Sequence, residues 1–131
     1  MIKENELKIG SILNYLTAEG DICTATIDWQ GLKWLNEDPK GFNMVHSVIE
    51  LTPEWLINFG FIYCKFSLSS LDRIDNYSKN RKIELTFENG EIKSVYVGVQ
   101  RIDDGKRIKY VHQLQNLYFA LTGEELELNQ H

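Results

Sequence analysis

The dipeptide Asn89-Gly90 constrains the fold of this chain more than any other sequence feature. It separates two segments in which apolar and polar residues alternate, Lys82–Glu88 and Glu91–Val99. A two-residue type I′ turn needs positive φ angles at both central positions, and asparagine followed by glycine adopts them most readily. The sequence therefore predicts an antiparallel β-hairpin. The expected register pairs Phe87 with Ile92, Leu85 with Ser94, and Ile83 with Tyr96.

A short helix is predicted before this hairpin, in the segment Ile49–Phe61. Thr52 suits the N-cap, Pro53 the first helical position, and Glu54 the positive end of the helix dipole. Gly60 supplies the left-handed conformation at which many helices end. Because two helical turns are not stable alone, this helix must pack against neighbouring strands.

The first third of the chain has the alternation and the β-branched residues of strands. The expected elements are strands at 7–15, 22–29 and 32–35, followed by a loop at 36–43. Short strands joined by glycine-containing turns favour a small, SH3-like β-barrel.

A second helix is predicted from Val111 to Leu121, where Thr122-Gly123 ends it. The expected fold is α+β, with an N-terminal SH3-like small β-barrel, the short capped helix, an antiparallel hairpin sheet and the C-terminal helix packed on that sheet. We expect a single domain over 1–131, with barrel-like strands in 1–48 and the other elements in 49–131.

Composition and charge exclude several classes of protein. The chain has 43% hydrophobic and 25% charged residues, which is ordinary for a globular domain and excludes disordered and fibrous classes. Its net charge of −5 argues against general nucleic-acid or anionic-membrane binding as its main activity. The longest apolar run, Trp55–Cys64, is too short for a membrane helix, which needs about 20 residues. With no export signal and no close cysteine pair, we expect a cytoplasmic protein with reduced thiols.

Three segments resemble a known group of proteins. They are residues 7–15, residues 49–61, which contain LTPEWLINFGF, and residues 110–126, which read YVHQLQNLYFALTGEEL. In these segments the chain is similar to a group of small uncharacterised proteins from gut anaerobes and their phages and prophages. The resemblance implies a mobile-element setting, and it brings no assigned activity and no catalytic residues.

The sequence contains few candidates for catalysis or metal binding. Cys23, His46, Cys64 and His112 are of metal-ligand type, but they lack the close pairs typical of zinc sites. Whether these four come together in space is left open by the sequence. The nucleophile-elbow, P-loop and dinucleotide-binding motifs are absent from the sequence. We therefore expect no enzymatic activity, no catalytic residues, no metal and no cofactor.

Basic residues gather in the segment 73–109, whose net charge is +3. A candidate site for a small anion or a nucleic acid at the hairpin end consists of Lys79, Arg81, Lys82, Arg101 and Arg107. The interleaved acidic residues favour a solvated sheet edge instead. Trp29 and Trp34, on either side of Gln30-Gly31, are either core residues or rings exposed to a base or a protein partner.

One side of the C-terminal helix is predicted to carry no formal charge at neutral pH. Its residues are His112, Gln115, Asn116 and Phe119. Uncharged amides around an aromatic ring are typical of interface cores, so this side is a candidate contact surface. The alternative is that the same chain covers it.

The leading functional hypothesis is a non-catalytic protein-interaction module of mobile-element origin, which contacts an unknown protein partner or self-associates. The alternative is a binder of a small anionic ligand or nucleic acid at the basic hairpin end, linked to host defence. Of these ligands, nucleic acid is the less expected, and no membrane association is expected.

Overall fold

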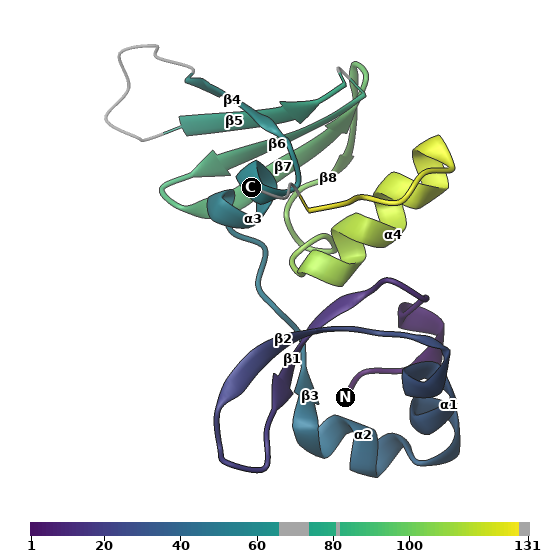
Figure 1. The fold of residues 1–131 in the computed structure, drawn as a ribbon. Helices are drawn as coiled ribbons and strands as arrows, with labels where there is room; N and C mark the ends of the chain where they lie inside the picture. The colour runs from purple at the N-terminus through teal and green to yellow at the C-terminus, as the bar shows by residue number, and fades with distance from the viewer. Residues whose placement is uncertain (66–73, 81, 129–131) are drawn as a thin grey trace. The chain divides into compact units, whose positions relative to one another are not determined.

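The computed structural model of the chain describes residues 1–65, 74–80 and 82–128, apart from the side chains of Cys64 and Lys65 (Figure 1). Helices and two antiparallel sheets confirm the predicted α+β class. The chain divides into two compact units. Unit 1 comprises Met1–Glu50 and Tyr110–Glu125, and unit 2 comprises Leu51–Lys109 and Leu126–His131. The first unit thus takes in the C-terminal helix in addition to the N-terminal region expected from the sequence.

Unit 1 is built on a small antiparallel sheet. Its described elements are η1 (Glu4–Glu6), β1 (Ile12–Leu16), β2 (Ile22–Thr26), α1 (Trp29–Glu37), α2 (Pro39–Val45), β3 (His46–Ser47) and α4 (Val111–Thr122). The strand order is β2-β1-β3, with β1 in the centre. The buried core consists of Ile2, Leu7, Leu13, Ile27, Leu35 and Phe42.

The strand predicted at 32–35 is wrong, because this segment lies in α1. Asp28 is the N-cap of α1, and its Oδ1 accepts a hydrogen bond from the N–H of Gly31 at 2.9 Å. Asp38 caps α2 in the same way from within the predicted loop, and Pro39 takes the first helical position. Two consecutive helices therefore replace the third strand and the loop. Among the described residues the sheet of unit 1 remains open and does not close into a barrel.

The C-terminal helix α4 begins at the predicted residue, Val111, and ends at Thr122, one residue later than predicted. It ends before Gly123, which adopts a left-handed φ of 74°. The helix belongs to unit 1, where it lies against β1. The sequence predicted packing on the hairpin sheet, but helix periodicity identifies an apolar face without identifying the partner of that face, and β1 is a partner within unit 1.

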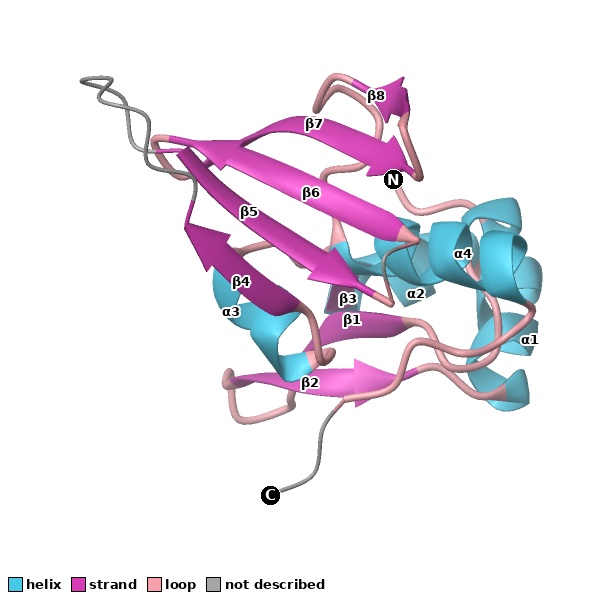
Figure 2. Cartoon of the chain, turned by 90° about the horizontal axis from the view of Figure 1, so that it is seen from above, coloured by secondary structure: helices cyan, strands magenta, loops and turns pink. Residues whose placement is uncertain are grey.

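Unit 2 contains an antiparallel sheet and one short described helix. The elements are α3 (Pro53–Asn58), β4 (Ile62–Lys65), β5 (Ile74–Lys79), β6 (Ile83–Glu88), β7 (Glu91–Val97) and β8 (Gln100–Asp103). Figure 2 shows the strands side by side in the order β4-β5-β6-β7-β8. The buried apolar side chains described in this unit are Leu51, Leu56, Phe59, Phe61, Tyr77, Ile83, Leu85, Phe87, Val95 and Leu126.

The predicted hairpin joins β6 to β7. Asn89 and Gly90 both have positive φ angles, 54° and 86°, as the predicted type I′ turn requires. Phe87 pairs with Ile92 as expected, but a β-bulge then shifts the register so that Leu85 pairs with Val95 and Ile83 with Val97. The predicted pairs Leu85–Ser94 and Ile83–Tyr96 are therefore wrong. Because one extra residue reverses the side-chain alternation, the bulge turns Val95 onto the buried face.

The helix signal in the middle of the chain is confirmed by α3. Thr52 is its N-cap, and the Thr52 hydroxyl accepts a hydrogen bond from the N–H of Trp55. Gly60, just beyond the helix, has a positive φ of 87°. Leu56 and Phe59 are fully buried, which is the stabilisation that two helical turns need.

None of the described helices is long and apolar enough to cross a lipid bilayer.

Candidate functional site

A groove on unit 1 lies between η1 and α1. It has a volume of about 720 Å³ and is lined by Glu4, Asn5, Leu7, Trp29, Leu32, Lys33 and Asn36. We call it the Trp29 groove. The Trp29 side chain is 62% exposed, although tryptophan is among the largest apolar side chains. The groove therefore offers an aromatic ring to solvent beside residues of the core.

The local sequence explains why Trp29 is exposed. The Asp28 cap makes Trp29 the first residue of α1, and helical spacing then places Trp29, Lys33 and Asn36 on one side of the helix. Leu35 lies on another side and is only 1% exposed, within the core of unit 1. From the sequence, Trp29 was either a core residue or a ring exposed to a partner. The structure places it at the surface.

Charge is distributed unequally between the two units. Unit 1 contains ten acidic residues and four lysines, a net charge of −6, whereas unit 2 contains nine acidic and ten basic residues, a net charge of +1. Residues 9–32 contain three acidic residues and no basic one. The field around unit 1 therefore favours positively charged partners.

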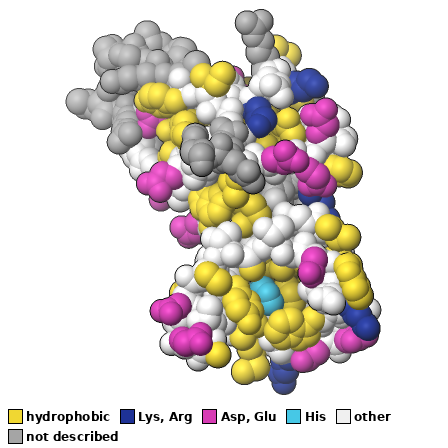
Figure 3. All heavy atoms as spheres, in the orientation of Figure 1, with side chains coloured by type: hydrophobic (Ala, Val, Ile, Leu, Met, Phe, Trp, Pro, Cys, Tyr) yellow, Lys and Arg dark blue, Asp and Glu magenta, His cyan; other side chains and the backbone are white. Residues whose placement is uncertain are grey.

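His46 belongs to a cluster of aromatic rings in unit 1. Its ring stacks on the ring of Phe42, with centroids 3.8 Å apart. Its centroid lies 5.4 Å from that of the Trp34 ring and 5.2 Å from that of the Tyr15 ring. The His46 Nδ1 lies 2.9 Å from the carbonyl oxygen of Phe42. Because a carbonyl oxygen only accepts hydrogen bonds, Nδ1 carries the hydrogen. Figure 3 shows a histidine surrounded by hydrophobic side chains on the displayed face. Packing accounts for His46 without a ligand.

His112 is a buried residue of unit 1, with 1% of its side chain exposed. Neither ring nitrogen has a hydrogen-bond partner among the described residues, and Nε2 lies 3.9 Å from Oε2 of Glu6. Burial lowers the pKa of His112, and the Glu6 carboxylate opposes this effect. The ring also stacks on Tyr110. The arrangement favours a neutral imidazole inside the unit.

The side chains of Gln115 and Asn116 form hydrogen bonds with backbone groups of unit 1. Gln115 is 2% exposed, accepts a hydrogen bond from Ile12 N–H, and donates one to Gly10 O. Asn116 donates to the carbonyl oxygen of Glu6 at 2.7 Å. The sequence placed His112, Gln115 and Asn116 on a possible contact face, but the structure buries His112 and Gln115 and ties Asn116 to the backbone. On α4, the absence of charged residues from this face therefore reflects burial within the same unit.

Phe119 differs from its three neighbours on that face. Its ring is 43% exposed, and the ammonium group of Lys8 lies 5.3 Å from the ring centroid. This cation–π contact covers part of the ring within unit 1. Phe119 alone of the four candidates thus has substantial exposed apolar surface.

The three metal-ligand candidates that the structure describes, Cys23, His46 and His112, are not assembled into a site. Cys23 is an exposed free thiol on β2, whereas His46 and His112 are buried in the contacts given above. The Cys64 side chain lies outside the described residues. Within the described part of the chain, no group of three or more histidine, cysteine, aspartate or glutamate side chains is arranged to hold a metal ion.

The described basic candidates of unit 2 differ in their burial and in their contacts. Lys79 donates to the carbonyl oxygen of Phe59, and burial lowers its pKa, while Glu127 opposes this. Lys82, Arg101 and Arg107 are exposed, and Arg81 lies outside the described residues. No convergent cationic site follows from the described members of this set.

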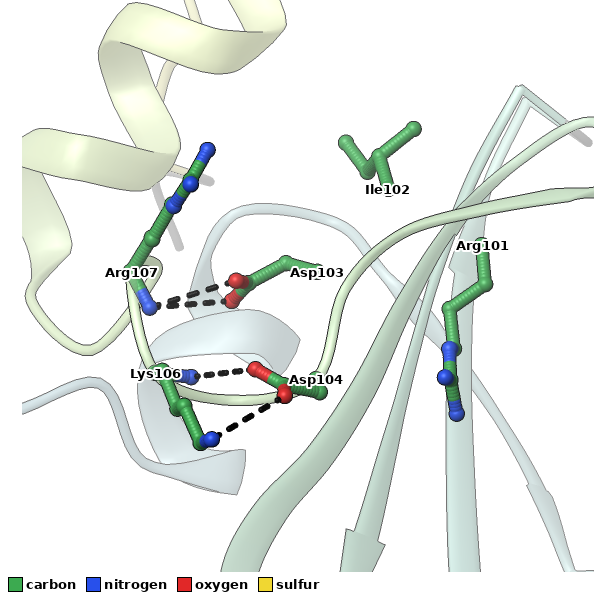
Figure 4. A pocket seen from close by; sticks show the side chains of 6 residues that line it. All are labelled: Arg101, Ile102, Asp103, Asp104, Lys106 and Arg107. Carbon is green, nitrogen blue, oxygen red and sulfur yellow. Dashed lines mark hydrogen bonds and ion pairs between the residues drawn. The ribbon is translucent and has the colours of Figure 1, made fainter.

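A shallow pocket of about 360 Å³ lies beside two of these residues. It is lined by Arg101, Ile102, Asp103, Asp104, Lys106 and Arg107 (Figure 4). Asp103 is buried and accepts backbone hydrogen bonds from Gly105, Arg107 and Ile108. Figure 4 shows the Arg101 and Arg107 side chains extending away from each other. The pocket is the outside of a loop folded around Asp103, and its two carboxylates oppose anion binding.

The chain matches no protein-family model, no curated protein and no solved structure in the comparisons made.

Proposed function

We propose that the protein is a non-catalytic protein-interaction module, and that the Trp29 groove is its contact surface. The observation that carries this proposal is the 62% exposure of Trp29 within a groove of about 720 Å³. Tryptophan is the side chain most enriched at the energetic centres of protein interfaces, since it buries a large area with little loss of conformational entropy. The resemblance to phage and prophage proteins supports a mobile-element setting for this module.

The partner that this surface suits is a basic protein with an apolar segment. The apolar segment would cover Trp29 and the exposed part of Leu32. The net charge of −6 on unit 1 would speed the approach of lysine- and arginine-rich surfaces and slow that of acidic ones. Rim charges such as Glu4 and Lys33 would then set orientation more than affinity.

The alternative, anion or nucleic-acid binding at the basic hairpin end, has less support. Two carboxylates, those of Asp103 and Asp104, share the pocket beside Arg101 and Arg107. Fluorescence-anisotropy titration with single-stranded RNA and DNA at low salt tests this alternative directly. Tight binding that weakens steeply with salt, and that Arg81→Glu with Arg107→Glu abolishes, would favour it over the groove.

The groove is tested by affinity capture from cells that carry the protein, followed by reconstitution with purified components. Wild type, Trp29→Ala and Met44→Ala are compared, since Met44 is an apolar residue outside the groove that is even more exposed than Trp29, at 78%. The expected partner is retained by wild type and by Met44→Ala, and is lost with Trp29→Ala.

Calorimetric titration of the purified partner then measures the loss directly. Removal of a tryptophan anchor is expected to weaken binding by about 2 kcal/mol or more, roughly thirtyfold, and added salt is expected to weaken the wild-type complex. Equal binding by Trp29→Ala and wild type would overturn the assignment of the groove.

A further inference from the structure

In the described part of the chain, the outer strand of the unit 1 sheet, β2, lacks the usual protection of a sheet edge. Among the described residues β2 pairs only with β1, and their register runs without interruption from Ile22 to Thr26 (Figure 1). These five residues, ICTAT, include no charged residue and no proline. Natural proteins commonly block exposed edges with charges, prolines or bulges, because an open edge pairs readily with another strand.

The hydrogen bonds of the hairpin fix which backbone groups of β2 face outward. Ile27 donates to Ser11 O at one end, and Thr17 donates to Asp21 O at the other, both at 2.8 Å. Since hydrogen-bonded pairs alternate along an antiparallel ladder, the backbone groups of Cys23 and Ala25 face β1. The N–H and C=O groups of Ile22, Thr24 and Thr26 therefore point away from the sheet.

We propose that β2 pairs antiparallel with β2 of a second copy of this chain, around a two-fold axis at Thr24. In this register Thr24 faces its own counterpart and Ile22 faces Thr26, so all three outward-facing residues of each strand exchange hydrogen bonds, about six in total. The two sheets would join into one, in the order β3-β1-β2-β2-β1-β3. A register centred on a neighbouring residue leaves some of these groups without a partner.

A second copy suits this edge because β2 is complementary to itself. No charged residue opposes another across the axis, and the pairs are threonine with threonine, isoleucine with threonine, and cysteine with alanine, which fit a sheet surface. At the end of the strand Asp21 would lie opposite Ile27 and not opposite an acidic residue. Pairing would also cover part of Ile22, which is 70% exposed.

The dimer is expected to be weak. Five residue pairs bury far less than the roughly 1,200–2,000 Å² of a stable protein interface, and unit 1 of each copy carries a net charge of −6, so the two copies repel each other. Sedimentation velocity should therefore show a reversible shift from monomer to dimer as the protein concentration rises, more pronounced at high salt than at low salt.

Cross-linking tests the register. In Ala25→Cys, the new thiol would face Cys23 of the other copy at a position where side chains approach closely, so mild oxidation should give a dimer held by two symmetric disulfides. Met44→Cys is the control, because Met44 is exposed outside this edge. Peptide mapping should link position 23 to position 25. Equal yields of covalent dimer from both variants would overturn the proposed register.

Thr24 itself tests the pairing. Thr24→Pro removes an outward N–H without removing a bond to β1, and Thr24→Lys places two ammonium groups opposite each other. Both variants should lose the concentration-dependent dimer, whereas Thr24→Val should keep it. If Thr24→Pro fails to fold, Thr24→Lys decides alone, and a dimer that survives the lysine overturns the proposal.

Discussion

Gln115 and Ile12 are joined across 103 residues of sequence: the backbone N–H of Ile12 donates to Oε1 of Gln115 at 2.9 Å. The same side chain donates through Nε2 to Gly10 O at 2.8 Å. One buried amide in α4 thus satisfies a donor and an acceptor on the chain entering β1. This pair of bonds specifies how the C-terminal helix meets the N-terminal sheet in unit 1.

Gln115→Ala should destabilise unit 1 by about 2 kcal/mol, since it leaves the buried N–H of Ile12 and the partly buried C=O of Gly10 without this partner. Urea unfolding followed by tryptophan fluorescence measures the change, because Trp29 and Trp34 both report on this unit. Ala120→Ser, at an exposed position of the same helix, should be nearly neutral. Equal midpoints for Gln115→Ala and wild type would show that the amide does not connect α4 to β1.

His112 should make the stability of unit 1 depend on pH. Burial lowers its pKa in the folded state, so below the ordinary value of 6.5 the unfolded chain binds a proton that the folded chain does not. Stability is therefore greatest above pH 6.5 and falls as the pH decreases. Unfolding midpoints at pH 7.5 and 5.5 should differ more for wild type than for His112→Phe.

Glu6→Gln provides the matched variant for this prediction. The Glu6 carboxylate raises the pKa of His112, in opposition to burial, so its removal should increase the loss of stability at low pH. The same pH response in wild type and His112→Phe would assign the dependence to other groups.

Local signals in the sequence predicted local structure well. Asn89-Gly90, Thr52-Pro53 and Thr122-Gly123 all lie where the structure has the corresponding turn, cap or helix end. Asp28 and Asp38-Pro39 were equally good signals for α1 and α2. Strand-like alternation around Asp28 favoured strands, and the turn-type residues around Asp38 favoured a loop. Helix caps are short-range hydrogen bonds, so the residues that form them can be recognised without knowledge of the rest of the fold.

Long-range features could not be predicted in the same way. The bulge in β7 depends on which of Ser94 and Val95 the core selects, and the site of α4 depends on hydrogen bonds from Gln115 to residues near position 11. The uncharged face of α4 suggested an interface because burial inside a unit and burial against a partner select the same residues. The exposure of Trp29 depends on the position at which α1 begins, and the strands predicted in this region gave no indication of that position.

Thr52→Ala should cost about 1 kcal/mol of stability in unit 2, because the Thr52 hydroxyl caps the N–H of Trp55 at the start of α3. Thr52→Ser keeps a capping hydroxyl and should restore most of the loss. Trp55 lies in this helix, so its fluorescence follows the transition during chemical unfolding. An unchanged midpoint for the alanine variant would remove the cap as a source of stability.

Gly105 and Gly90 should respond very differently to alanine, although both adopt left-handed conformations, with φ angles of 90° and 86°. A Cβ at Gly105 would lie 2.1 Å from the backbone oxygen of Ile92, whereas a Cβ at Gly90 meets nothing within 4 Å. In both variants alanine must adopt a left-handed backbone conformation, which costs about 1–2 kcal/mol. The difference between their stabilities therefore measures the clash at position 105. Gly105→Ala should therefore unfold at a clearly lower urea concentration than Gly90→Ala. Its free energy of unfolding should be lower by about a further 2 kcal/mol or more. Equal losses in the two variants would mean that the loop after Asp103 does not press against β7.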